Sequence, residues 1–281
     1  MDRIAQTFYT CQQEQRAAII GFLTCGDPNF EDSFNIIDAA CSAGLDVLEL
    51  GIPFSDPTAD GPVIQKASQR ALKSGITLEK CLTLAKKIRE RRHDIPIVLF
   101  GYFNPILAYG PARLVHDALD AGIDAFLCVD LPVERFHEIT DFRPLDRTFD
   151  PIRLIAPTTT DERMKTILPD ASGFIYLQSR SGVTGVRNVN PADRLDFIRR
   201  QTSRIRQWTS LPIAVGFGVS TSDDVASLSP LCDGIVVGSK LVLHIEKHFD
   251  PESRSFARDD AIHELTNFVA SLARSSRRSA D

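Results

Sequence analysis

The chain has 281 residues, 43% of them apolar, with a net charge of −5 and a pI near 5.7, which is ordinary for a globular protein. The acidic balance and the lack of a long basic stripe argue against nucleic acid as a main partner. No run of 18 apolar residues occurs, and the N-terminus lacks the apolar core of a signal peptide. We therefore expect a cytoplasmic protein that does not bind a membrane.

Eight short runs rich in Val, Ile, Leu and Phe recur along the chain, separated mostly by stretches with helical spacing. They cover residues 18–23, 47–50, 95–100, 125–129, 152–155, 174–177, 213–215 and 235–237. Strands that alternate with helices pair in parallel, and eight of them favour a closed (β/α)8 TIM barrel over the alternative, a doubly wound sheet. A barrel of this kind occupies about 250 residues. We expect one domain over residues 1–274 and a flexible tail over 275–281.

Helical spacing is clearest in four segments. Residues 4–15 precede the first strand and are expected to cap the bottom of the barrel. A helix begins near Ile64, a further one covers 77–91, and 261–272 keeps helical spacing near the C-terminus.

Glycine-rich and acidic segments follow the ends of the apolar runs, which favours the barrel, because there all of them gather on one rim. These segments are Gly26-Asp27-Pro28, Gly51-Ile52-Pro53, Gly101-Tyr102-Phe103-Asn104-Pro105, Asp130-Leu131-Pro132, Ser181-Gly182-Val183-Thr184-Gly185, Gly216-Phe217-Gly218 and Gly238-Ser239.

Glu49 and Asp60 form a candidate acid/base pair. Glu49 continues the strand face of Leu45 and Val47, where a charge is costly unless chemistry requires it. Desolvation there should raise the pKa of Glu49, whereas Asp60, on a wetter loop, should stay ionised. The alternatives are a structural ion pair for Glu49 and a turn role for Asp60 and its neighbour Asp56.

Two rim segments have the composition of a phosphate site. Gly216 and Gly218 follow the seventh run, and Gly238 and Ser239 follow the eighth, which are the positions where barrels most often bind phosphate. Residues 180–187 form a polar loop that could cover an anionic substrate. Ordinary tight turns and a plain surface loop are the alternatives.

Cysteine and histidine give little indication of chemistry. The six cysteines include no CxxC pair, so neither a zinc site nor a disulfide framework is indicated. Cys25 and Cys128 lie at expected strand ends, but no adjacent base would activate them. His244 and His248 are four residues apart, and without a third ligand they indicate a solvated helix face rather than a metal site.

The motifs, in their order along the chain, resemble those of the tryptophan synthase alpha chain family. The resemblance rests on LELGIPFSDPTADGPVIQKASQRAL, the Gly101 and Asp130 segments above, SRSGVTG and GFGVS, and extends from the first strand to Lys240. It implies a (β/α)8 barrel and a lyase of tryptophan biosynthesis that splits indole-3-glycerol phosphate into indole and glyceraldehyde 3-phosphate. The residues after about His248 resemble nothing specific.

The resemblance also implies roles for individual residues. Glu49 would be the general acid/base, Asp60 would bind the indole N–H, and Thr184 would orient Asp60. The indole pocket would be lined by Phe22, Phe100, Leu127 and Tyr176. The phosphate would be held by Gly185, Gly216, Gly218, Gly238 and Ser239.

The implied partner is a tryptophan synthase beta chain in an allosteric α2β2 complex through which indole passes internally. Pyridoxal phosphate would belong to the beta chain, so this chain itself would need no cofactor and no metal. The interface would include Asp56, Pro57, Asn104, Pro105 and Pro132.

Three other functions stay open at this point. The chain could release indole without a partner, or it could be a regulatory subunit that no longer cleaves, although intact Glu49 and Asp60 speak against that loss. An indole-glycerol phosphate synthase would need a catalytic lysine on a barrel strand, and none of the eight runs contains one.

Overall fold

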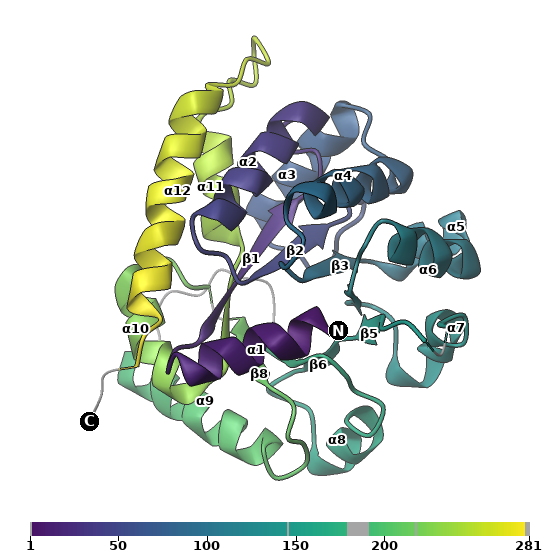
Figure 1. Ribbon diagram of the computed structural model, residues 1–281, viewed down its shortest axis with the longest axis vertical. Helices are drawn as coiled ribbons and strands as arrows, with labels where there is room; N and C mark the ends of the chain where they lie inside the picture. The colour runs from purple at the N-terminus through teal and green to yellow at the C-terminus, as the bar shows by residue number, and fades with distance from the viewer. Residues whose placement is uncertain (1, 145, 179–190, 217, 279–281) are drawn as a thin grey trace.

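The computed structural model describes residues 2–144, 146–178, 191–216 and 218–278, with the strands gathered into one parallel sheet that curves into a nearly closed barrel (Figure 1). β1 pairs with β2 on one side and with β9 on the other, so the first and last strands are neighbours. This pairing confirms the TIM barrel and excludes a doubly wound sheet. The strands are β1 Ala18–Thr24, β2 Val47–Gly51, β3 Ile97–Gly101, β4 Ala125–Cys128, β5 Asp150–Pro151, β6 Arg153–Ile155, β7 Ile175–Gln178, β8 Ile213–Gly216 and β9 Gly234–Val237.

The fifth expected strand is divided in two. β5 pairs with β4 and β6 pairs with β7, so this segment changes its ladder partner at Ile152. Pro151 has no N–H to donate, which interrupts the ladder, whereas the Ile152 N–H donates to the Phe126 carbonyl at 2.9 Å. The two ends of the sheet are thus consecutive parts of one segment, and the chain itself completes the ring.

Helices surround the strands, and α12 lies along the outside beside α2, α10 and α11 (Figure 1). The helices expected over residues 4–15, 77–91 and 261–272 correspond to α1, α4 and α12. The helix expected near Ile64 is α3. In the described ranges no helix is long and apolar enough to cross a membrane. The helices are α1 Arg3–Gln13, α2 Phe30–Ser42, α3 Pro62–Lys73, α4 Leu78–Arg91, α5 Phe103–Tyr109, α6 Pro111–Asp120, α7 His137–Thr140, α8 Asp161–Ile167, α9 Pro191–Ile205, α10 Ser222–Leu228, α11 Ser239–Lys247 and α12 Arg258–Ser275.

The barrel interior is a packed core closed at its bottom by α1. Ile4 and Phe8 of α1 belong to the same buried cluster as inward residues of the strands, such as Val98. The Phe8 and Phe174 rings lie 5.6 Å apart between centroids. α1 therefore caps the barrel interior at the N-terminal end of the strands.

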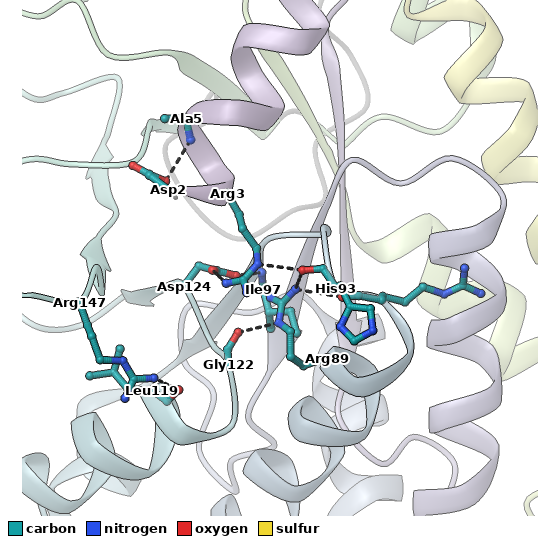
Figure 2. A network of polar contacts seen from close by, with 11 residues as sticks. Asp2, Arg3, Ala5, Arg89, His93, Ile97, Leu119, Gly122, Asp124 and Arg147 are labelled. Carbon is teal, nitrogen blue, oxygen red and sulfur yellow. Dashed lines mark hydrogen bonds and ion pairs between the residues drawn. The ribbon is translucent and has the colours of Figure 1, made fainter.

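A buried carboxylate organises the bottom of the barrel beside α1 (Figure 2). Asp124 precedes β4 and accepts hydrogen bonds from Arg3 Nη1 at 2.7 Å and Arg89 Nη2 at 2.8 Å. The Ile97 N–H donates to the same carboxylate at 2.8 Å, and Arg89 also reaches the Gly122 carbonyl at 3.0 Å. These contacts tie α1, α4, β3 and the start of β4 together at the end of the barrel far from the glycine-rich rim.

The chain continues beyond α12 in contact with the body. Ser276 is buried and its carbonyl accepts from the Ala17 N–H at 3.1 Å, while the Arg278 N–H donates to the Gln15 carbonyl at 2.8 Å. The described part of the expected tail is therefore held against the start of β1. The last three residues lie outside the described residues.

Candidate functional site

A cavity of about 330 Å³ opens at the carboxyl ends of the strands. Both carboxylates of the candidate acid/base pair line it, together with expected apolar and glycine positions. The expected residues that line it are Phe22, Glu49, Asp60, Phe100, Tyr176, Gly216, Gly218, Gly238 and Ser239. The fold therefore brings together residues that are up to 217 positions apart in the chain, between Phe22 and Ser239.

Glu49 is fully buried on β2, in register with Phe22 of β1 and Val98 of β3. Val47 lies in the barrel interior, as expected, whereas Leu45 precedes β2 and packs in the outer layer. Neither carboxylate oxygen of Glu49 has a hydrogen-bond partner among the described residues. Desolvation raises its pKa to about 8, so the protonated form exceeds the ionised form roughly tenfold at pH 7.

Asp60 lies on the loop between β2 and α3 and is half-buried rather than on a wet surface. Burial raises its pKa to about 6, against an opposing hydrogen bond from Tyr102. At pH 7 the ionised form still prevails, by roughly ten to one. The expected division of charge between Glu49 and Asp60 thus holds, although the environment of Asp60 is drier than the sequence indicated.

Tyr102 holds the Asp60 loop over the cavity. Its hydroxyl oxygen accepts from the Ala59 N–H at 3.0 Å, and its hydroxyl group opposes the rise in the pKa of the nearby Asp60 carboxyl. The Phe54 ring packs against it with centroids 5.3 Å apart. In the sequence Tyr102 belongs only to the turn motif that begins at Gly101, and its position directly after Gly101 at the end of β3 is the signal for a site residue.

Aromatic rings form the apolar side of the cavity. Phe22 and Phe100 meet edge to face, with ring centroids 5.1 Å apart. Tyr176 lies over Gly216, where an added Cβ would come 2.4 Å from the tyrosine hydroxyl oxygen. Leu127, in register with Phe100, is buried in the barrel interior and does not line the cavity. Ile64, Val129, Leu154 and Val236, which sequence analysis did not select, also line it.

The glycine segments that line the cavity beside these rings offer backbone N–H groups. Gly218 has a φ of +63°, and no atom lies within 4 Å of a Cβ added there. Gly238 is the N-cap of α11, and neither a capping side chain nor an acidic residue in the first turn occupies this helix start. Because Gly238 and Ser239 line the cavity, the N–H groups that open α11 lie at its wall, and no acidic residue in the first turn satisfies them, which suits an anion.

Other expected positions have different outcomes. Thr184, Gly185 and the expected covering loop 180–187 lie outside the described residues. Among the expected interface residues Asp56, Asn104 and Pro132 are exposed, Pro105 is half-buried and Pro57 is buried.

The cysteines and histidines show no arrangement for catalysis. Burial raises the pKa of the Cys25 and Cys128 thiols, which disfavours the reactive thiolate. His244 and His248 both lie near Glu264, at 3.7 and 3.3 Å. Within the part of the chain that the structure describes, no group of three or more His, Cys, Asp or Glu side chains could hold a metal ion.

Comparisons with known proteins agree with this geometry. A family model described as tryptophan synthase alpha chain matches residues 8–270. Over 250 residues the chain is 48% identical to the tryptophan synthase alpha chain of Desulfatibacillum aliphaticivorans, covering 89% of this chain and 92% of that protein. A second such chain, from Marinobacter nauticus, is 40% identical over 276 residues, or 97% of this chain and 100% of its own length.

Solved structures are similar over almost the whole fold. The tryptophan synthase subunit alpha of Legionella pneumophila str. Paris superposes with a TM-score of 0.85 at 31% identity, covering 98% of each chain. A chain in the structure of Mycobacterium tuberculosis tryptophan synthase has a TM-score of 0.86 at 28% identity and covers 99% of each chain.

Proposed function

Because the chain belongs to the tryptophan synthase alpha chain family, it is a lyase that cleaves indole-3-glycerol phosphate, and we propose that Glu49 and Asp60 carry the proton transfer and charge stabilisation of this cleavage. The observation that carries the proposal is the buried Glu49 carboxyl, which has no described hydrogen-bond partner and faces the same cavity as Asp60. A carboxyl group with a pKa of about 8 can both give and take a proton near neutral pH.

In the first step the protonated Glu49 gives its proton to C3 of the indole ring. Positive charge then spreads to the ring nitrogen, where the ionised Asp60 accepts the N–H and stabilises it. In the second step the Glu49 carboxylate takes the proton of the adjacent glycerol hydroxyl. The C–C bond breaks, its electron pair restores the aromatic ring, and a carbonyl forms, giving indole and glyceraldehyde 3-phosphate with Glu49 protonated again.

Substrate orientation follows from the two sides of the cavity. The indole ring would pack among Phe22, Phe100 and Tyr176, which places C3 toward Glu49 and the N–H toward the Asp60 loop. The phosphate would bind near Gly218 and the start of α11, where N–H groups are available. The remaining phosphate positions assigned by resemblance are Gly185, Gly216, Gly238 and Ser239, with Thr184 orienting Asp60.

The partner in this proposal is a tryptophan synthase beta chain in an α2β2 complex, to which the indole passes. Asp56, Asn104 and Pro132 support it, because they are exposed in the segments that directly follow three neighbouring strands at the cavity end of the barrel. The Phe103 N–H, at the start of α5, donates to Asp130 at 2.7 Å and links two of these segments. The retro-aldol step needs only proton transfers, so this chain would use no cofactor of its own, and pyridoxal phosphate would belong to the beta chain.

The first test measures indole release from indole-3-glycerol phosphate, by the chain alone and with a tryptophan synthase beta chain added. Slow release that rises strongly with the beta chain supports the subunit of a complex. Fast release by the chain alone favours an independent indole producer. No release in either condition would leave a regulatory subunit and refute the catalytic proposal.

Two variants test the residue roles in the same assay. Glu49→Gln should abolish cleavage and Asp60→Asn should reduce it about 10²-fold or more, the scale of general acid–base and electrostatic contributions. The exposed Glu79→Gln and Asp259→Asn are matched controls and should cleave like the wild type. Activity retained by Glu49→Gln removes Glu49 as the proton carrier.

A further inference from the structure

Lys240 is a cation at the edge of the active-site cavity that the reaction steps above do not use. It is the second residue of α11, next to Ser239, and lines the cavity together with Leu243 one turn later. Among the described residues that line the cavity, Lys240 is the single basic side chain, while Glu49 and Asp60 are the acidic ones.

Lys240 has no carboxylate partner among the described residues. Its ammonium group makes no ion pair within 4.0 Å and no hydrogen bond with them. Lys247 on the same helix contrasts with it, because its Nζ lies 2.8 and 2.9 Å from the two Glu264 oxygens. In the sequence, residues 179–190, which include the expected covering loop 180–187, contain no Asp or Glu, so they cannot supply an acidic side chain either.

The position of Lys240 is unfavourable without a ligand. A cation in the first turn of a helix lies against the positive end of the helix dipole, and α11 has no acidic residue there to compensate. A substrate phosphate at the start of α11 would reverse this, because its negative charge interacts favourably with the N–H groups and the ammonium together.

The charge of the substrate points the same way. Gly218 and Gly238 provide neutral N–H donors, whereas an ionised Asp60 in the same cavity repels a phosphate. An ammonium at the cavity edge offsets that repulsion and attracts the phosphate end of the substrate. This attraction sets the orientation of the substrate, with its phosphate between β8 and α11.

Resting on the proposed function, we propose that Lys240 is a specificity-determining residue that pairs with the phosphate of the substrate and of the glyceraldehyde 3-phosphate product. It distinguishes phosphorylated from unphosphorylated glycerol compounds and does not take part in proton transfer.

The test compares wild type, Lys240→Met, Lys240→Arg and the control Lys247→Met on the same helix. Calorimetry with glycerol 3-phosphate measures binding, and indole release in the presence of the beta chain gives KM and kcat. Lys240→Met should bind glycerol 3-phosphate about 10- to 100-fold more weakly, the usual range for a hydrogen bond to a charged group, with a parallel rise in KM and little change in kcat. Lys240→Arg should keep most of the affinity, and Lys247→Met should match the wild type.

A second arm uses indole-3-glycerol, which lacks the phosphate. Its KM should be the same for wild type and Lys240→Met, and a difference there would show that Lys240 acts by packing rather than by charge. If the wild type cleaves the substrate and Lys240→Met has the same affinity for glycerol 3-phosphate and the same KM, the Lys240 assignment alone is overturned. Wild-type protein that binds glycerol 3-phosphate through Lys240 but cleaves nothing would overturn the proposed function alone.

Discussion

The Phe22 ring occupies the space over Gly51, so that a Cβ added to Gly51 would lie 2.5 Å from Phe22 Cζ. This separation is far below a van der Waals contact, and the same ring meets Phe100 edge to face at the cavity. The absence of a side chain at the end of β2 thus sets the position of an aromatic ring that lines the cavity.

Replacing Gly51 with Ala should displace the Phe22 ring into the cavity, because the rigid ring cannot avoid the added Cβ in any other way. We expect a loss of stability of about 1–3 kcal/mol, typical of overpacking, and a higher KM for indole-3-glycerol phosphate. Adding Phe22→Leu removes the clashing Cζ and should recover part of the stability. Denaturant unfolding and steady-state kinetics measure both, and a double variant no more stable than Gly51→Ala would contradict the packing explanation.

The pH dependence of kcat/KM should be bell-shaped. The proposed mechanism requires an ionised Asp60, with a pKa of about 6, and a protonated Glu49, with a pKa of about 8, so activity should be highest near pH 7. In Asp60→Asn the residual activity should lose the acidic limb and keep the alkaline one. An acidic limb that persists in this variant would assign it to another group.

Folding stability should fall with rising pH because of Glu49. Its folded pKa of about 8 lies above its ordinary value of 4.5, so its contribution is fully present below about 4.5 and is lost as the pH rises through 8. The loss is on the order of 5 kcal/mol as an upper bound. The stability of Glu49→Gln relative to wild type should therefore increase from pH 5 to pH 9 in denaturant unfolding, and a constant difference would contradict the raised pKa. Asp60 titrates in both proteins, so its contribution cancels in the difference in stability between them.

Asp124 should matter for stability and not for chemistry. Asp124→Asn leaves Arg3 and Arg89 without their shared carboxylate at the closed end of the barrel, and we expect a loss of about 3–5 kcal/mol. Thermal unfolding should show this loss, while kcat below the unfolding temperature should stay near that of wild type. Asp259→Asn, on the exposed face of α12, is the control. A selective fall in kcat with unchanged stability would refute this assignment.

Arg153 should be replaceable with a gain in stability. It is buried on β6, and its Nε and Nη1 have no hydrogen-bond partner among the described residues. Desolvation lowers its pKa to about 10, and its guanidinium lies 3.7 Å from the centroid of the Phe136 ring. Arg153→Met keeps the ring contact and removes the orphaned donors, so unfolding should require about 1–3 kcal/mol more. Leu154, not Arg153, lines the cavity, so activity should not change; a less stable variant would contradict the prediction.

The sequence by itself determined the strands, the order of the rim segments and the two carboxylates. Apolar runs, glycine turns and helical spacing such as that of residues 77–91 are local signals, carried by residues a few positions apart, so they can be recognised without the fold. Glu49 was recognisable because a charge interrupted an apolar strand face. Motifs of the family then indicated the reaction.

The tertiary structure decided what each side chain faces. The drier environment of Asp60 and the Tyr102 contact depend on the loops after β2 and β3 meeting, and the position of Lys240 depends on α11 beginning at the rim. The division of the fifth strand depends on two different neighbours. Burial and ligand-facing geometry arise from segments that are far apart in the chain, and no local pattern encodes those distances.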